Sequence, residues 1–541
     1  MFCDSHQVNQ LTSLLLQHGL RHIVVCPGSR NATIVHNLNE LPSHFTLHPV
    51  TDERSAAFVA LGIVLALQEP VAICVTSGSA LLNCIPAVAE AFYRHLPLLV
   101  ISADRPQRVL GQLDGQTLPQ IGALRPYCPT FQVDPTTDEA CRHVNNRRIN
   151  EAFLSLHNQG GHPAHINVSI EEPMFSFTTP HLPQERVISV VRPIIQHHPI
   201  PEEVVQLIAS ARLPVLLLGQ YERGDLRKQT DDLNRQNQLL ILPEIISDVQ
   251  GNFRMNAFDE LVSSELSLMP DVVIQVGGNF VHKSFKSALR KSHNCRVIRI
   301  AEEDALADTF DHLTLQIQAP ANEALKQLSE QLPHTHQGVV EAALKLDHAW
   351  AENVQHRSSE VKALTLDSTL QSLQEALSHY KEAFTLHLAN SSAIRAAGRH
   401  FKSGSFPIFC NRGTNGIEGS LSTAVGYALQ MWGLSIVVIG DLSFFYDVNA
   451  LWNTHLPHNL RILLLNNGHG GIFDHLPGLD QSPARTEYVA AGYQHFTAEG
   501  VAKSFHVGYL RADSLSALPT LMQQWIAESE EAQILEIFLN N

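Results

Sequence analysis

The sequence lacks the signals of several protein classes. None of its eight cysteines lies in a C-x-x-C pair, which argues against a disulfide framework or a structural zinc site. No apolar run reaches the roughly 18–20 residues that a membrane helix needs. The start, "MFCDSHQVNQL", has no basic segment followed by an apolar one, so we expect no signal peptide. These absences favour a cytoplasmic protein without a membrane span.

Positive charge is in short supply. The chain has 37 lysines and arginines against 53 aspartates and glutamates, a net charge of −16, which argues against nucleic acid as the main partner. An anionic small substrate stays compatible, because a pocket can be locally basic. The 30 histidines show no H-E-x-x-H or similar ligand spacing, so we interpret most of them as ordinary surface and core residues.

The chain of 541 residues is too long for a single core. Short apolar runs such as "HIVVC", "LPVLLLG" and "LSIVVIG" alternate with helix-length amphipathic stretches, a pattern typical of parallel sheets covered by helices. Proline-rich polar stretches, "EEPMFSFTTPHLPQE" and "SEQLPHTHQGVVEAA", separate the runs into three groups. We predict three doubly wound parallel-sheet α/β domains, at residues 1–180, 186–335 and 345–541.

Polar side chains follow two neighbouring runs of the third group. Asp441 follows "SIVVIG", and Asn466 and Asn467 follow "RILLL". A right-handed crossover would bring both strand ends to the same edge of a sheet, where ligands bind in open parallel sheets. Carboxylate and amide oxygens are ligands suited to Mg²⁺. An N-capping aspartate and a turn-forming Asn-Asn-Gly would also explain these residues.

The segments "GDLS" and "NNGHGGIF" resemble the cofactor signature of thiamine-diphosphate enzymes. The resemblance implies that Asp441, the Asn467 side chain and the backbone carbonyl of His469 bind Mg²⁺, with Mn²⁺ as the alternative ion. Relatives usually have a small residue at the His469 position. The resemblance also implies a large aliphatic residue, Ile417, that props the cofactor in a bent shape. The implied thiamine-diphosphate contacts are Gly440, Leu442, Ser443, Gly470, Gly471 and Ile472.

A second element of these enzymes is a glutamate that hydrogen-bonds N1′ of the aminopyrimidine ring and so promotes loss of the C2 proton. "TDERSAA" resembles that segment and implies this catalytic role for Glu53, in a pyrimidine-binding first domain. An acid favoured at a helix N-terminus is the plainer explanation, and it fits Asp52 better than Glu53. In this superfamily the glutamate and the metal ligands of one site come from different subunits, which implies a homodimer or homotetramer.

Cationic residues follow several predicted strands, in "CPGSR", "SADRP", "NSSAIR", "CNRG" and "GGNFVHKSFK". Each could be an ordinary surface charge. Together, in an acidic protein, they indicate a pocket for several carboxylates, because arginine binds a carboxylate as a two-pronged donor.

A narrower resemblance lies in "CPGSR", "TDERSA", "SADRP", "DGQTLPQ", "NRGTNGIEGSLSTAVG" and "NNGHGGIFDHLPG" of the first and third predicted domains, and the middle domain matches weakly apart from the lysine segment "GGNFVHKSFK". It is to the MenD family, the 2-succinyl-5-enolpyruvyl-6-hydroxy-3-cyclohexene-1-carboxylate (SEPHCHC) synthases of menaquinone biosynthesis. These transferases decarboxylate 2-oxoglutarate and add the remaining unit to isochorismate. The resemblance implies that the substrates contact Ser29, Arg30, Arg105, Gln116, Lys283 (or Lys286), Ser391, Arg395 and Arg412. The implied apolar wall is Ile472, Phe473 and Leu476.

Two other functions stay open at this point. A 2-keto acid decarboxylase or acetohydroxyacid synthase would act on monocarboxylates and would not need so many arginines. The synthase would also bind a flavin in the middle domain, which "VVIQVGGNF" alone does not decide. A non-catalytic metabolite sensor predicts loss of Glu53 or Asp441, and both are present.

Overall fold

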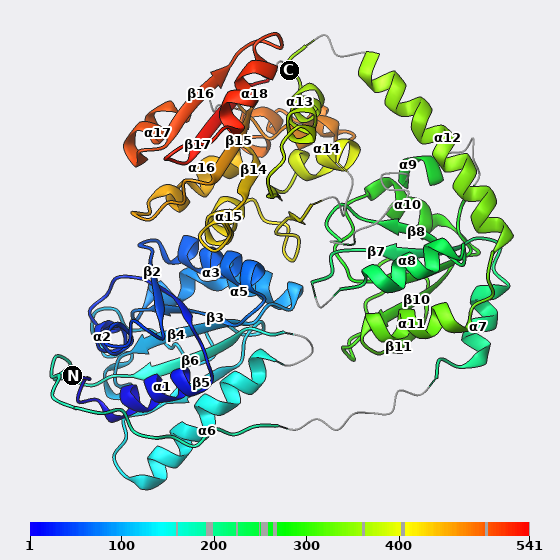
Figure 1. The fold of residues 1–541 in the computed structure, drawn as a ribbon. Helices are drawn as coiled ribbons and strands as arrows, with labels where there is room; N and C mark the ends of the chain where they lie inside the picture. The colour runs from blue at the N-terminus through cyan, green and yellow to red at the C-terminus, as the bar shows by residue number, and fades with distance from the viewer. Residues whose placement is uncertain are drawn as a thin grey trace.

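The apolar runs form three parallel sheets flanked by helices, as expected for this fold class (Figure 1). The computed structural model describes residues 1–157, 161–190, 199–222, 225–247, 249, 258–262, 268–359, 363–401, 406–492 and 496–539. In Figure 1 the blue N-terminal lobe and the orange-red C-terminal lobe lie on one side and the green middle lobe on the other. Within the described residues, no helix combines the length and the apolar character needed to cross a membrane.

The first sheet has six parallel strands in the order β2-β1-β3-β4-β6-β5. The strands are β1 (His22–Val25), β2 (Thr46–Pro49), β3 (Val71–Val75), β4 (Leu98–Asp104), β5 (Thr130–Val133) and β6 (Ala164–Ser169). The helices are α1 (His6–Gln17), α2 (Ala32–Asn39), α3 (Glu53–Leu67), α4 (Ser79–Asn83), α5 (Ile85–Arg94) and α6 (Glu139–Leu156), with a short 3₁₀ turn η1 (Gln107–Val109). Strands β3, β4 and β6 are buried along their whole length, which explains why the first two read as continuous apolar runs.

The middle sheet has five parallel strands in the order β11-β10-β9-β7-β8. They are β7 (Pro214–Leu218), β8 (Leu240–Pro243), β9 (Val272–Val276), β10 (Arg296–Ala301) and β11 (Leu313–Gln318). The helices are α7 (Glu202–Ala209), α8 (Arg227–Arg235), α9 (Phe258–Leu261), α10 (Lys283–Lys291), α11 (Ala321–Gln331) and α12 (Gln337–Ser359). Helix α12 runs across residue 345, and its buried Val339, Ala342 and Leu346 join the core of the middle sheet.

The third sheet repeats the topology of the first. Its order, β13-β12-β14-β15-β17-β16, matches β2-β1-β3-β4-β6-β5 strand for strand. The strands are β12 (Phe384–Leu388), β13 (Ile408–Phe409), β14 (Leu434–Gly440), β15 (Leu460–Asn466), β16 (Gly508–Ala512) and β17 (Gln533–Phe538). The α-helices are α13 (Leu366–Ser378), α14 (Ser392–His400), α15 (Ser420–Ala428), α16 (Asp441–Tyr446), α17 (Glu499–Phe505) and α18 (Leu518–Ile526). Short helical turns are η3 (Val448–Leu451), η4 (Gly471–His475), η5 (Leu479–Gln481) and η6 (Arg485–Val489).

Helices α3 and α15 occupy equivalent places in the two sheets, and they pack against each other (Figure 1). A Cβ on Gly62 of α3 would lie 2.0 Å from the carbonyl oxygen of Thr423, and one on Gly426 of α15 would lie 2.0 Å from that of Val59. The two backbones therefore touch at a reciprocal pair of glycines, which leaves no room for any side chain.

We predict that Gly426→Ala lowers the stability of the chain by about 1–3 kcal/mol, because the new methyl group forces the two helices apart. Gly500→Ala in α17 is the matched control. Its Cβ meets nothing within 4 Å, so better helix propensity should add up to about 1 kcal/mol. Thermal and urea unfolding of both variants would measure the difference. Equal behaviour of the two variants would contradict the tight crossing.

Candidate functional site

The structure brings Asp441 and the loop after β15 together at one sheet edge. Strands β14 and β15 pair in parallel with Gly440 opposite Leu465, so both chains leave the sheet at the same level. The Asp441 carboxylate then accepts hydrogen bonds from the backbone N–H groups of Leu442 and Gly468, both at 2.8 Å. These bonds fix the carboxylate at the start of α16 beside the loop that carries Asn467 and His469.

Asp441 is an unusually placed carboxylate. It is 4% exposed, and burial raises its pKa, although the N–H groups of Leu442 and Gly468 and the nearby His469 act in the opposite direction. A buried carboxylate with only backbone partners is costly unless a cation balances it. The side-chain oxygens of Asp441 and Asn467 and the carbonyl of His469 are hard donors that suit Mg²⁺. The residues present therefore fit the metal that the resemblance implies.

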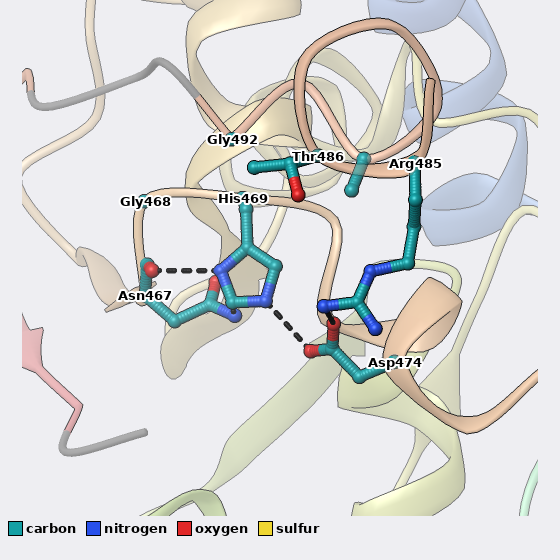
Figure 2. A pocket seen from close by; sticks show the side chains of 8 residues that line it. Asn467, Gly468, His469, Asp474, Arg485, Thr486 and Gly492 are labelled. Carbon is teal, nitrogen blue, oxygen red and sulfur yellow. Dashed lines mark hydrogen bonds and ion pairs between the residues drawn. The ribbon is translucent and has the colours of Figure 1, made fainter. Parts of the chain in front are cut away.

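His469 lines a cavity of about 390 Å³, shown in Figure 2. Its Nδ1 donates to the Asn467 carbonyl at 2.9 Å, and its Nε2 bonds the Asp474 carboxylate at 2.7 Å. Burial disfavours the charged imidazolium, but the bonds to Asp474 and Asn467 outweigh it and raise the pKa of His469. Arg485 approaches Asp474 from the other side at 3.7 Å. Where relatives usually have a small residue, the His469 side chain thus stabilises the loop by bonding Asn467 and Asp474.

The remaining expected cofactor contacts gather around the same edge. Ser443 donates its hydroxyl to the carbonyl of Ile417, so the Ile417 loop and α16 are tied together. The Ile417 side chain is 40% exposed, and the space where a Cβ of Gly440 would stand is empty. Gly470 is held by a bond from its N–H to the Ala490 carbonyl at 2.6 Å. Open space beside Gly440 and an uncovered aliphatic side chain leave room for a cofactor.

Glu53 begins α3 at the edge of the first sheet. Its carboxylate accepts a hydrogen bond from the Asn83 side chain at 3.0 Å. Burial, together with this carboxylate, raises the pKa of the Cys84 thiol, which places the two groups near each other. The neighbouring Asp52 caps the helix by accepting from the Ser55 N–H at 3.0 Å. Asp52 therefore acts as the N-cap of α3, whereas the Glu53 carboxylate bonds the Asn83 side chain.

The expected substrate contacts of the first domain form one group at the ends of β1 and β4. Arg30 is buried and binds the Ile170 carbonyl and the Glu172 carboxylate, both at 3.1 Å. Arg105 is half-buried, and its Nε is buried without a hydrogen-bond partner among the described residues. Ser29 and Gln116 are exposed. The Gln116 backbone lies 3.3 Å from where a Cβ of Gly78 would stand, which brings its loop to the β3 edge.

The expected substrate contacts of the third domain form a second group, and its cations repel each other. Burial lowers the pKa of Arg395, and the charge of Arg412 lowers it further. Burial lowers the pKa of Lys286, as do Arg290 and Arg412, against the opposite effect of Asp311. Lys286 of the middle domain therefore lies within electrostatic reach of Arg412, whereas Lys283 is exposed.

Among the described residues, the Arg412 side chain has one hydrogen-bond partner, the Asn390 amide oxygen, which accepts from its Nη1 at 3.1 Å. Its Nε is buried and unpaired, and no carboxylate pairs with Arg395 or Arg412 in the described part of the chain. Ser391, next to Asn390, has a φ of 75°, a strained value for a residue with a side chain. Unpaired cations held close together form a site that an anion would stabilise.

The expected metal ligands Asp441, Asn467 and His469, called the clamp below, have no direct bond to the site residues of the first domain in the described part of the chain. There, no hydrogen bond or ion pair joins Glu53, Arg30 or Arg105 to the clamp or to Arg395 and Arg412. Instead, the start of α3 contacts the end of α16 and the turn η3 that follows it. Arg54 donates to the Tyr446 carbonyl of α16, and Asn449 of η3 donates to Asp52, both at 2.7 Å.

Sequence reasoning missed several residues of the site. Asp474 follows the glycine-rich loop by three residues, so its nearness to His469 could have been suspected from the sequence. Asn390 follows a strand just as Asn467 does, and that parallel was a usable signal. Arg485, Thr486 and Gly492 line the cavity of Figure 2 from a separate turn of the chain, and no motif marks them.

Two like sheets, one with Asp441 and Asn467 at its edge and the other with Glu53, suit a thiamine-diphosphate enzyme, and the comparisons show that the chain belongs to that class. The family model described as "Thiamine pyrophosphate enzyme, N-terminal TPP binding domain" matches residues 7–123. Along its length the chain is similar to 2-succinyl-5-enolpyruvyl-6-hydroxy-3-cyclohexene-1-carboxylate synthases, and it belongs to that family. The synthase of Phocaeicola vulgatus is 38% identical, over 99% of this chain and 96% of the relative. That of Bacteroides thetaiotaomicron is 36% identical over 100% and 97%.

We predict that Asp441→Asn weakens binding of Mg²⁺ and thiamine diphosphate by at least about tenfold, because the amide removes the charge that balances the cation. Asp513→Asn is the control, since Asp513 is exposed and pairs with Arg511. Titration calorimetry with Mg²⁺ and thiamine diphosphate would measure both variants. Unchanged affinity in Asp441→Asn would remove Asp441 from the clamp.

Proposed function

We propose that this chain catalyses the thiamine-diphosphate- and Mg²⁺-dependent decarboxylation of 2-oxoglutarate and the addition of the remaining four-carbon unit to isochorismate. The products would be SEPHCHC and CO₂, in menaquinone biosynthesis. The observation that carries this proposal is similarity over the full chain to synthases of that name. The unpaired cations around Arg412 give independent support, because the two substrates together bring four carboxylates.

The cofactor and metal would be held by the third domain. Asp441, Asn467 and the His469 carbonyl would bind Mg²⁺, and the contacts from Gly440 to Ser443 and from Gly470 to Ile472 would surround the diphosphate. Bound thiamine diphosphate supplies a nucleophilic carbon that attacks the keto group of a 2-keto acid. Glu53 would hold a proton at the aminopyrimidine N1′. Ile417 would support the bent shape of the cofactor.

The substrate would be held by the two groups of cations. Arg395 and Arg412 would bind the distal carboxylate of 2-oxoglutarate, beside Ser391 and a wall of Ile472, Phe473 and Leu476. A charge-assisted hydrogen bond contributes about 1.5–3 kcal/mol, so two such contacts give substantial affinity. We keep Lys283 in the proposed set and add Lys286, because burial and Arg412 act on Lys286 directly. Ser29, Arg30, Arg105 and Gln116 would complete the pocket.

The separation of the two groups supports an oligomer. Because no hydrogen bond or ion pair joins Glu53 to the clamp among the described residues, a complete site would need the first domain of a second copy, in a homodimer or homotetramer. We also propose the domain division at 1–180, 186–335 and 345–541, although α12 carries the middle core past residue 345 to Leu346. The eight cysteines are free thiols, which supports a place in the reducing cytoplasm.

The first test is CO₂ release from 2-oxoglutarate by the purified protein with thiamine diphosphate and Mg²⁺, with and without isochorismate. We expect isochorismate-dependent turnover and an adduct of the right mass by mass spectrometry. Turnover on pyruvate would agree with the proposed cofactor and metal ligands but would favour a decarboxylase or acetohydroxyacid synthase as the function. Cofactor binding without turnover on any 2-keto acid would favour a metabolite sensor.

In the same assay, Glu53→Gln should reduce kcat by at least about 100-fold, the lower end of what a positioned proton-transfer group contributes. The amide has the shape of the carboxylic acid but cannot exchange a proton with the cofactor ring. Thermal unfolding should be close to that of the wild type, because Asn83 is the one hydrogen-bond partner of the Glu53 side chain in the part of the chain that the structure describes. Retained turnover would contradict the role of Glu53.

Arg412→Gln should raise KM for 2-oxoglutarate by at least about tenfold, the effect of one lost charge-assisted contact. Arg511→Gln provides the control, because Arg511 is exposed and pairs with Asp513. Initial rates against 2-oxoglutarate at saturating isochorismate would measure both. An unchanged KM in Arg412→Gln would show that the substrate carboxylate binds elsewhere.

A further inference from the structure

The turn 411–416, which follows β13 and carries Arg412, is held from all three lobes of the chain. Within the third lobe, the Asn390 amide donates to the carbonyls of Asn411 and Gly416, both at 2.7 Å. From the middle lobe, Gln220 donates to the Cys410 carbonyl at 2.9 Å, just before the turn. The first lobe contributes the charged contacts, through Glu90 and Arg94 of α5.

Glu90 binds the far side of this turn. One carboxylate oxygen accepts from the Gly413 N–H at 3.0 Å, and the other accepts from the Thr414 N–H at 2.8 Å and the Thr414 hydroxyl at 3.0 Å. The Glu90 side chain is fully buried. The approach is close, because a Cβ on Gly413 would lie 2.8 Å from the Glu90 carbonyl oxygen.

Arg94 lies beside the Glu90 carboxylate and joins it to the turn and to the middle lobe. Its Nη1 lies 3.6 Å from Glu90 and donates to the Asn411 amide oxygen at 3.0 Å. Its Nε donates to Glu222 of the middle lobe at 3.1 Å, and its Nη2 forms a second bond to the same carboxylate. Burial disfavours the charged guanidinium, yet Glu222 and Glu90 outweigh it and raise the pKa of Arg94.

These contacts oppose the electrostatic repulsion among the cations of the proposed substrate site. Arg395 and Arg412 repel each other, and Lys286 adds a third positive charge. A free turn would swing Arg412 away from the other cations into water. A turn bound on both sides through its backbone cannot do so, and the cations remain together for an incoming carboxylate.

We propose that Glu90 is a positioning residue for substrate binding: it binds the backbone of Gly413 and Thr414 and so holds Arg412 beside Arg395, ready for a carboxylate of 2-oxoglutarate. The inference rests on the proposed function for the identity of that carboxylate. Glu90 does not touch the substrate in this scheme. It acts through the turn, from a different domain.

The test is Glu90→Gln in the full-length protein. The amide has nearly the shape of the carboxylate, but its NH₂ group must face the N–H of either Gly413 or Thr414, and two donors cannot bond. We expect KM for 2-oxoglutarate to rise at least about tenfold, with a smaller change in kcat and unchanged binding of thiamine diphosphate. Hydrogen–deuterium exchange should be faster in peptides that contain Gly413 and Thr414.

The matched control is Glu185→Gln. Glu185, which follows the first domain and packs on it, is also a buried glutamate, but it binds Arg142, Gln10 and Asn146 and, among the described residues, has no bond to the turn. We expect it to affect stability and to leave KM unchanged. Thr414→Val is a milder second variant that removes one hydroxyl donor to Glu90. We expect it to raise KM about two- to fivefold, a typical effect of one neutral hydrogen bond.

Faster exchange in the turn together with a raised KM would support the proposal. Unchanged exchange, or faster exchange with an unchanged KM, would overturn it. So would equal losses in Glu90→Gln and Glu185→Gln, because they would indicate a general effect on folding. A wild-type chain that releases no CO₂ from 2-oxoglutarate would contradict the proposed function instead, and the exchange data would still show whether Glu90 holds the turn.

Discussion

The backbone contact between α3 and α15 is the constraint on which the site depends. The crossing at Gly62 and Gly426 locks the helix that begins with Glu53 against the helix that follows the Ile417 loop. Asp447, which follows α16, is fully buried and caps α15 by accepting from the N–H and hydroxyl of Ser422, both at 2.8 Å. Burial raises the pKa of Asp447 to about 6, although the Ser422 bonds and Arg54 oppose this. Through these contacts the crossing also sets the place of α16, which begins with Asp441.

A second constraint is that buried charges need partners that offset their loss of hydration. Arg94 and Glu90 are completely buried and Glu222 almost so, and each is stabilised by an opposite charge or by backbone donors. Arg395 and Arg412 are treated differently, because among the described residues no carboxylate balances them. Asp441 is likewise buried with no cation paired to it among the described residues, but its charge is negative. Glu90, Arg94 and Glu222 are thus balanced within the chain, whereas Arg395, Arg412 and Asp441 have no ion-pair partner among the described residues and are expected to meet substrate or metal.

The strands that the sequence revealed most plainly are those with an unbroken apolar centre. "VAICV" forms β3, and "ILLL" forms the middle of β15 between Arg461 and Asn466. Strand β6, "AHINVS", is equally buried but contains His165 and Asn167, and its pattern gave no signal. Those side chains are satisfied inside the fold, since the Ser102 hydroxyl bonds both, at 2.7 and 2.6 Å. Partners of this kind come from distant parts of the chain, so a local pattern cannot reveal them.

The sequence by itself determined the three-sheet fold, the acid and amide at the ends of β14 and β15, and the excess of cations at strand ends, because these follow from local patterns of apolar and polar residues. Only the tertiary structure decided which cations stand together, that Asp474 lies between His469 and Arg485, and that Glu90 and Arg94 hold the turn of Arg412. These contacts join residues as many as 324 positions apart, as Glu90 and Thr414 are. Their geometry arises when helices and sheets pack, which no short stretch of sequence specifies.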